Sequence, residues 1–225
     1  TTTGLDAAAT VFTPNTFAAA PVRQSRANLA ASSGDPRGGF GWATAVVSTS
    51  GSANAATGAA GSADQAEVGR MVANAFDVMP DRVLHLSTGV IGTRLPLDKV
   101  AVGLEALDPL ATMDDAGLAA AAEALRTTDS VTKMATTTIE LQDGDGCPVR
   151  VTVSGIAKGV GMIHPNMATM LSIVLTDAAI EPVDLWGLLR PAAARTWDQL
   201  SVDGDTSTND TVFVLASGVG GARPV

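Results

Sequence analysis

The sequence is poor in the residues that form disulfides and metal sites. It contains one cysteine, Cys147, which excludes an internal disulfide and a metal site built from cysteines. A single cysteine is also typical of a protein from a reducing cytoplasm, so we expect a cytoplasmic location. The two histidines, His85 and His164, fall in no recognisable triad pattern. We therefore expect no metal ion in this protein.

Basic residues are also scarce and scattered. The 14 Lys and Arg are outnumbered by 23 Asp and Glu, which gives a net charge of −9. Nucleic acids and anionic membranes bind clustered basic residues, so neither is expected as a partner. The apolar runs are too short to span a bilayer, and the first residues lack the pattern of a signal peptide. These features favour a soluble intracellular enzyme or binding domain.

Short apolar segments and helical patterns alternate along the 225 residues, a length that suits one large domain or two small ones. Strands are predicted at 11–13, 43–47, 83–86, 136–141, 148–154, 170–175, 200–202 and 211–216. Helices are predicted from a capping box at Ser62 and Gln65, from Pro96, over 114–126 and over 182–198. We expect Pro191 to kink or split the last helix, and 48–61 to form a loop. The mixture favours a layered α/β or α+β fold.

The stretch from Gly155 to Asp177 carries the most information, and it reads GIAKGVGMIHPNMATMLSIVLTD. A glycine-broken turn at Lys158 leads to a loop around His164, and the apolar run from Met170 fits a buried strand. Thr169 stands at the head of that strand. From spacing alone it is either an ordinary strand start, which is the favoured interpretation, or a nucleophile held at a sheet edge.

The segment GMIHPNMATML, with AKG upstream, resembles the self-cleavage segment of the ornithine acetyltransferase family, the bifunctional glutamate N-acetyltransferases of arginine biosynthesis. Further matching segments lie at 11–13, 20–22, 52–55, 87–92 and 208–212. The resemblance implies that the chain cleaves itself between Ala168 and Thr169, so that Thr169 becomes an N-terminal nucleophile. The amine released with it has a pKa near 8 and can act as the base, so no histidine partner is needed.

The same resemblance implies the remaining site residues. STGVIG is similar to the oxyanion segment of the family, so the Thr88 hydroxyl and the Gly89 N–H would stabilise the tetrahedral intermediate. Thr127 of a TTD motif and Lys158 of the AKG segment would bind the amino-acid substrate. Without the resemblance, these residues form an ordinary strand-to-loop turn, a helix end and a solvated cation.

Other motifs are interpreted as structural. The segment Asp203–Asp210 begins like a calcium loop but has Thr208 and Val214 where that loop needs Gly and Glu. KGVG places its lysine before the glycines, which is the wrong order for a phosphate loop. His85 lies in an apolar strand and is expected to be a core residue.

The resemblance implies a ping-pong reaction in which Thr169 takes acetyl from N-acetylornithine and passes it to glutamate. Acetyl-CoA is a possible co-substrate, since some family members use it as donor, and no other cofactor is expected. The implied assembly is a heterotetramer of two alpha and two beta chains. The alternatives are a self-cleaving aminopeptidase-like amidase and a non-catalytic small-molecule binding domain in which Thr169 merely starts a strand.

The implied fold is the layered α/β fold that this family shares with the N-terminal aminopeptidases, here incomplete at both ends. Residues 1–168 would be an alpha-chain-like part without its opening segment, and 169–225 the start of a truncated beta-chain-like part. We therefore expect these residues alone to be inactive or weakly active.

Overall fold

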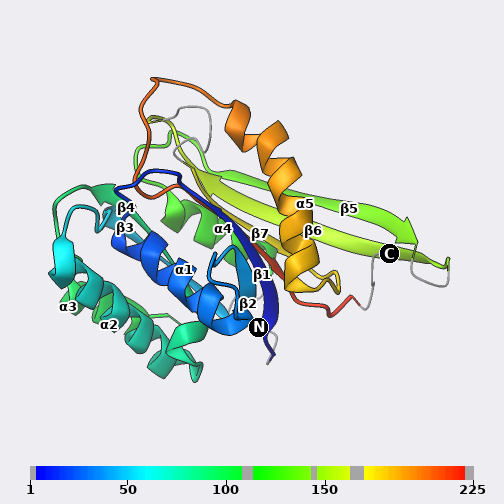
Figure 1. The fold of residues 1–225 in the computed structure, drawn as a ribbon, viewed down its shortest axis with the longest axis horizontal. Helices are drawn as coiled ribbons and strands as arrows, with labels where there is room; N and C mark the ends of the chain where they lie inside the picture. Colours follow the sequence, from blue (N-terminus) through cyan, green and yellow to red (C-terminus); the bar gives the residue numbers. More distant parts are fainter. Residues whose placement is uncertain (1–3, 108–113, 143–145, 163–169, 221–225) are drawn as a thin grey trace.

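The computed structural model describes residues 4–107, 114–142, 146–162 and 170–220, and its centre is a six-stranded mixed sheet (Figure 1). The strand order is β2-β1-β8-β7-β6-β5, with β7 and β8 parallel and the other neighbours antiparallel. The strands are β1 Asp6–Phe12, β2 Phe40–Ala43, β5 Lys133–Gln142, β6 Pro148–Lys158, β7 Leu171–Thr176 and β8 Thr211–Ala216. A second, parallel sheet pairs β3 Ala45–Ser52 with β4 Val83–Val90.

Helices and the second sheet cover the central sheet on both faces. The helices are α1 Ala20–Ser33, α2 Gly58–Phe76, α3 Leu97–Glu105, α4 Asp115–Leu125 and α5 Pro182–Arg195, with 3-10 turns at Pro80–Arg82 and Trp197–Gln199. On one face, Leu185 and Leu189 of α5 pack against the sheet. On the other face, Leu84 and Leu86 of β4 pack against it together with α4. The result is a layered α/β protein, as the sequence predicts.

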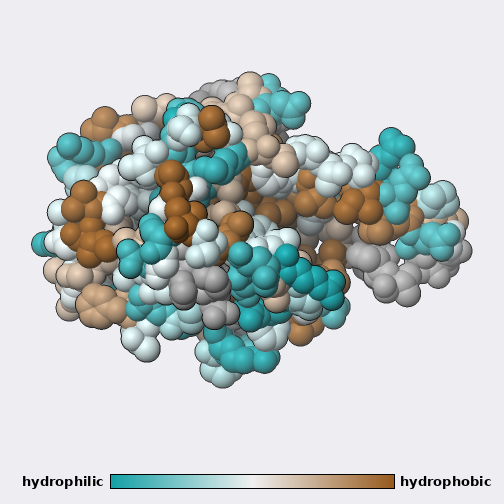
Figure 2. Space-filling view, turned by 90° about the horizontal axis from the view of Figure 1, so that it is seen from above, coloured by the Kyte–Doolittle hydropathy of each residue, from teal (hydrophilic) through white to brown (hydrophobic). Residues whose placement is uncertain are grey.

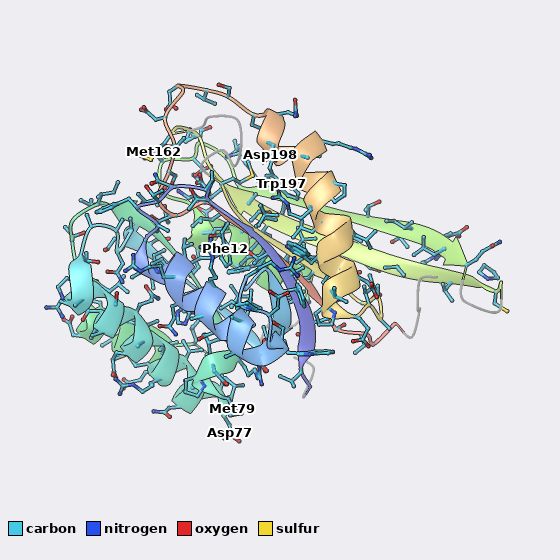
Figure 3. The ribbon with its side chains drawn as sticks, viewed as in Figure 1. Phe12, Asp77, Met79, Met162, Trp197 and Asp198 are labelled. Atoms are coloured by element: carbon cyan, nitrogen blue, oxygen red, sulfur yellow. The ribbon has the colours of Figure 1, made fainter. Side chains whose placement is uncertain are left out.

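The strand β8 shows why a central strand of this sheet consists of consecutive apolar residues. All six of its residues are buried, although strand side chains alternate between faces. Val212 and Val214 face the α5 cluster, whereas Phe213 and Leu215 face the cluster that contains β4. Phe213 also packs edge-on against Phe12 of β1, with ring centroids 6.1 Å apart (Figure 3). A strand that is covered on both faces needs no polar side, so apolar length alone identifies it.

The hairpin of β5 and β6 extends beyond the body of the molecule (Figure 1). It confirms the predicted strand pair, since Thr136 lies opposite Ser154. Apolar side chains follow one side of this arm, and Figure 2 shows them on its surface. Val151 is buried among them, whereas Ile139 on the edge strand β5 is 43% exposed.

Two predictions between residues 43 and 76 are wrong. The predicted loop at 48–61 contains the rest of β3, which ends at Ser52, and the start of α2 at Gly58. Ser62 therefore lies inside the helix, where its Oγ donates to Gly58 O at 3.3 Å, and does not cap it. The strand β3 was predicted too short because most of its residues are small or polar. Its pairing with β4, and not its own hydrophobicity, defines it as a strand.

Three further differences have physical causes. The helix α1 was not predicted, because its buried face includes the polar Ser25 and Asn28 beside Leu29. The predicted strand at 200–202 is an irregular segment in which Leu200 and Val202 are exposed. The helix α5 is not split at Pro191, since Leu185 and Leu189 before it and Ala193 after it are buried against the sheet.

Candidate functional site

The ends of three strands meet at one end of the central sheet. Lys158, the last residue of β6, pairs with Leu171 of β7, which in turn pairs with Thr211 of β8. The N–H of Thr211 donates to Met170 O at 3.1 Å. Ala168 and Thr169, the predicted cleavage point and nucleophile, lie outside the described residues. Residue 170, which follows them, opens β7 at this end of the sheet, next to Lys158 and Thr211.

Lys158 is a buried ammonium and not a solvated one, with 7% of the residue exposed. Its Nζ donates to Thr127 Oγ1 at 3.4 Å, which brings together the two residues predicted to bind substrate. Burial lowers the pKa of Lys158, and Lys133 adds to that shift, while the carboxylates of Asp129 and Asp210 oppose it. Thr127 itself is exposed just after the end of α4, so this hydrogen bond connects a buried ammonium group with a hydroxyl at the surface.

Asp129 is the carboxylate that organises this corner, and the sequence analysis missed it. Its Oδ1 accepts from the Gly159 N–H at 2.8 Å and forms an ion pair with Lys133. Arg126 donates to its backbone carbonyl at 2.7 Å. Burial raises the pKa of Asp129, but the hydrogen bonds from Lys133 and Gly159 outweigh burial, so the pKa is lowered. Its signal was its place in the same TTD motif as Thr127.

Thr88, the predicted oxyanion residue, lies in β4 and is 6% exposed. Alternation along the strand places its side chain on the same face as Leu84 and Leu86. Those leucines pack in one cluster with Leu171 and Phe213 of the central sheet. The Thr88 side chain is therefore on the face of β4 that is turned toward the central sheet.

Gly89 occupies a position that other residues do not fit. Its φ is +131°, and a Cβ built on it would lie 2.3 Å from the carbonyl carbon of Gly51 on the neighbouring strand. The close approach of β3 and β4 therefore requires glycine at this position, and it keeps the backbone at Gly89 uncovered by any side chain of its own.

Among the described residues, side chains and not another strand form hydrogen bonds with the backbone groups on the outer edge of β4. The bonds are Asn28 Nδ2 to Val83 O at 2.8 Å, His85 N to Ser25 Oγ at 2.8 Å, and Asn209 Nδ2 to Ser87 O at 2.9 Å. Every second residue from Val83 to Ser87 uses this edge, and the register with β3 then shifts, since Ser52 pairs with both Thr88 and Val90. Asn209 also donates to Ala53 O at 2.7 Å, so the start of β8 is fastened to both strands of the second sheet.

These contacts connect the predicted oxyanion segment with the predicted substrate residues. Asn209 contacts the carbonyl of Ser87, next to Thr88, and Asp210 is close enough to Lys158 to act on its charge. The preceding chain is tied in as well, because the N–H of Met162 donates to Asp203 Oδ2 at 2.6 Å (Figure 3). The structural role expected for Asp203–Asp210 agrees with these hydrogen bonds.

His85 is the core residue that the sequence predicts. It is 1% exposed, and its Nδ1 lies 2.9 Å from Gln65 Nε2. Gln65 Oε1 accepts from Asn54, so the amide nitrogen of Gln65 donates and Nδ1 accepts. Burial lowers the pKa of His85 to about 4, so the ring is neutral.

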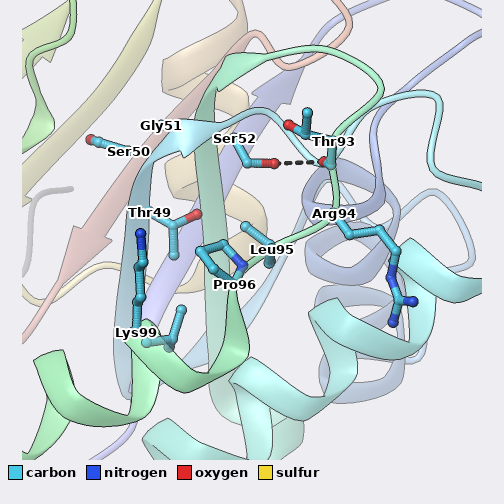
Figure 4. Close-up of a pocket in the computed structure, with 10 residues that line it drawn as sticks. Thr49, Ser50, Gly51, Ser52, Thr93, Arg94, Leu95, Pro96 and Lys99 are labelled. Atoms are coloured by element: carbon cyan, nitrogen blue, oxygen red, sulfur yellow. Dashed lines mark hydrogen bonds between the residues drawn. The ribbon is translucent and has the colours of Figure 1, made fainter.

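A cavity of about 500 Å³ lies between β3 and the start of α3 (Figure 4). Two of its polar groups have partners in the protein: Ser52 Oγ donates to Thr93 O at 2.7 Å, and Arg94 binds both carboxylate oxygens of Asp64. A second hollow of about 610 Å³ lies beside Trp42 and the start of α5. Neither is lined by Thr88, Gly89, Thr127 or Lys158.

Within residues 4–107, 114–142, 146–162 and 170–220, no three His, Cys, Asp or Glu residues come together as metal ligands would. No helix in these ranges has the length and hydrophobicity to cross a membrane.

The sequence is similar to proteins of known families over nearly its whole length. The profile described as "ArgJ family" matches residues 2–224. An arginine biosynthesis bifunctional protein ArgJ from Symbiobacterium thermophilum is 45% identical over 215 residues, which cover 96% of this chain and 50% of that protein. A mitochondrial ArgJ from Penicillium rubens is 44% identical over 219 residues, covering 97% and 43%. The chain thus spans about half the length of the curated relatives it matches.

Two crystal structures are similar to the fold. Bacillus halodurans ArgJ has a TM-score of 0.54 at 30% identity, over 75% of this chain and 92% of that one. Ornithine acetyltransferase from Mycobacterium tuberculosis, crystallised with ornithine, has a TM-score of 0.55 at 33% identity, over 73% and 78%. The family resemblance seen in the sequence is confirmed by these matches.

Proposed function

Because the chain belongs to the ArgJ family, we propose that it carries the acetyl-transfer site of a glutamate N-acetyltransferase of arginine biosynthesis. The observation that carries the proposal is the buried Lys158, which lies between Asp129 and Asp210 beside the strand that Met170 opens. A buried cation held at a strand end suits an amino-acid carboxylate.

In the proposed reaction, self-cleavage between Ala168 and Thr169 releases the Thr169 amine. That amine takes the proton of the Thr169 hydroxyl, whose oxygen attacks the acetyl carbonyl of N-acetylornithine. The tetrahedral intermediate collapses with protonation of the leaving nitrogen, so ornithine departs and acetyl-Thr169 remains. The α-amine of glutamate then attacks the ester, and Thr169 recovers its proton as N-acetylglutamate leaves.

The Thr88 hydroxyl and Gly89 N–H stabilise the oxyanion of both tetrahedral intermediates in this proposal. The support is their position: Thr88 faces the central sheet, and Gly89 has no side chain to cover its amide. Lys158 binds the substrate α-carboxylate, and Thr127, within reach of its ammonium, contacts the substrate from the surface side.

The partners and location follow from the same proposal. The donor is N-acetylornithine, for which the ornithine complex of the Mycobacterium tuberculosis relative gives support, and the acceptor is glutamate. Acetyl-CoA is a further donor, and no other cofactor takes part. Residues 1–168 and 169–225 contribute to the alpha and beta chains of a cytoplasmic heterotetramer.

A single-turnover assay tests the proposal. The purified protein is mixed with N-acetylornithine labelled in the acetyl group, and protein-bound label is followed before and after glutamate is added. We expect label on the residue-169 peptide, its transfer to glutamate, and neither with Thr169→Ala. Loss of the label to water at the same rate with and without glutamate would instead indicate the amidase. No label on a wild-type protein that spans the length of its curated relatives would contradict the proposed function.

A further inference from the structure

The carboxylate of Asp129 is almost completely enclosed, with 1% of its side chain exposed. One oxygen, Oδ1, accepts from Gly159 N–H and pairs with Lys133. The other, Oδ2, is buried and has no hydrogen-bond partner among the residues that the structure describes. A buried carboxylate costs free energy unless charges nearby compensate it, so this one depends on the adjacent ammonium groups.

Two carboxylates and two ammonium groups lie close enough here to act on one another's charges. Asp129 follows α4, Lys133 begins β5, Lys158 ends β6 and Asp210 precedes β8. The two lysines differ in their access to water. Lys133 keeps 37% of its side chain exposed, so solvent stabilises its charge. Lys158 is buried, so its charge depends on Asp129 and Asp210.

Building on the proposed function, we propose that Asp129 is a positioning residue that keeps Lys158 in its charged form and fixes the Gly159 amide. Lys158 is the last residue of β6, and Gly159, whose N–H donates to Asp129 Oδ1, follows it directly. An ammonium attracts a substrate carboxylate, whereas a neutral amine does not. Asp129 therefore acts on substrate binding through Lys158, without touching the substrate.

The variant Asp129→Asn separates charge from shape. Its amide oxygen can still accept from Gly159 N–H, but the negative charge is lost. We expect the pKa of Lys158 to fall further below its ordinary value in this variant, because burial is then opposed by Asp210 alone. A residue with a purely structural role would not move this titration.

The chain contains three lysines, Lys99, Lys133 and Lys158, so NMR of lysine labelled at Cε resolves each titration in the full protein. Lys99→Arg and Lys133→Arg assign the signals. The matched control is Glu123→Gln, which removes an exposed carboxylate from the same end of α4. We expect the Lys158 titration to move to lower pH in Asp129→Asn and to stay in place in Glu123→Gln. An unchanged Lys158 titration in Asp129→Asn would overturn the inference.

A second variant, with the opposite expected shift, keeps the test valid if Asp129→Asn does not fold. Lys133→Met removes the cation that competes for Asp129, so the Lys158 titration should move to higher pH. No movement there would also overturn the inference.

Kinetics complete the test. In Asp129→Asn, KM for N-acetylornithine should rise about tenfold with kcat nearly unchanged, since a charged contact is lost in binding, and Asp129→Glu should restore it in part. An unchanged KM would count against the role. If the wild type transfers no acetyl group, the proposed function fails, whereas the NMR titration still decides whether Asp129 controls Lys158.

Discussion

Gly89 is the residue at which backbone geometry constrains the proposed site most. Gly89→Ala places a Cβ against the Gly51 carbonyl at a φ of +131°. We expect the free energy of unfolding to fall by about 2 kcal/mol or more, measured by urea denaturation. The control is Gly187→Ala in α5, where a Cβ meets nothing within 4 Å and helix propensity favours alanine. Equal stability of both variants would contradict the assigned strain.

His85 predicts how stability depends on pH. Burial lowers its pKa from 6.5 to about 4, so between these values the unfolded chain takes up a proton that the folded protein does not. The contribution of His85 to stability is therefore constant above pH 6.5 and is lost as the pH falls toward 4, by about 3 kcal/mol in all.

The comparison is between the wild type and His85→Gln, with the free energy of unfolding measured across this pH range. The variant should be less dependent on pH, whatever its stability at neutral pH. The lowered carboxylate pKa values, such as that of Asp64 beside Arg94, act at lower pH and do not mask the effect. A pH dependence equal to that of the wild type would show that His85 is not the group responsible.

At the scale of elements, Asn209, just before β8, bonds to the residue after β3 and to Ser87 in β4. Asn209→Ala leaves the carbonyls of Ala53 and Ser87 without their donor, and both residues are buried. We expect unfolding to become easier by about 3 kcal/mol, because unsatisfied buried carbonyls keep their desolvation cost. Asn15→Ala is the control, since its side chain leaves no buried carbonyl with a lost short bond: it donates to Ser207 O at 3.4 Å and accepts from the exposed Phe17 N–H at 2.9 Å. A loss no larger than in the control would mean that Asn209 does not fasten β4.

Elements with strong local signals were predictable from the sequence. The strand β8 and the helix α4 were predicted to within one residue of their observed bounds, and the β5–β6 hairpin was predicted with strands three to four residues short. The strand β3 and the helix α1 were not, because partners distant in sequence define them. β3 is small and polar, and α1 buries polar side chains that bond to β4. Such elements have no hydrophobic period of their own.

For the candidate site, the residues could be predicted from the sequence but their surroundings could not. Motifs identified Thr88, Gly89, Thr127 and Lys158, and the structure joins Thr127 with Lys158 at one strand end. No sequence pattern indicates that Lys158 is buried, or that Asp129 and Asp210 act on its charge. Those facts arise when the ends of β6 and β8 come together, 52 residues apart in numbering between Lys158 and Asp210.

At the scale of the whole molecule, the layers bring the two parts of the chain on either side of residue 169 into one sheet. β7 and β8, which follow it, lie between β6 and β1, which precede it. A cut before Thr169 would therefore leave both pieces held by strand pairing and by the shared core. We expect the cleaved pieces to stay together under native conditions and to separate in denaturant.

The intact mass of the purified protein, measured after denaturation, tests the central claim most directly. The account predicts two pieces whose masses meet between Ala168 and Thr169, and one uncut piece for Thr169→Ala. It also predicts that N-acetylornithine adds the mass of one acetyl group to the piece that begins with Thr169. A single uncut, folded wild-type chain would contradict the account.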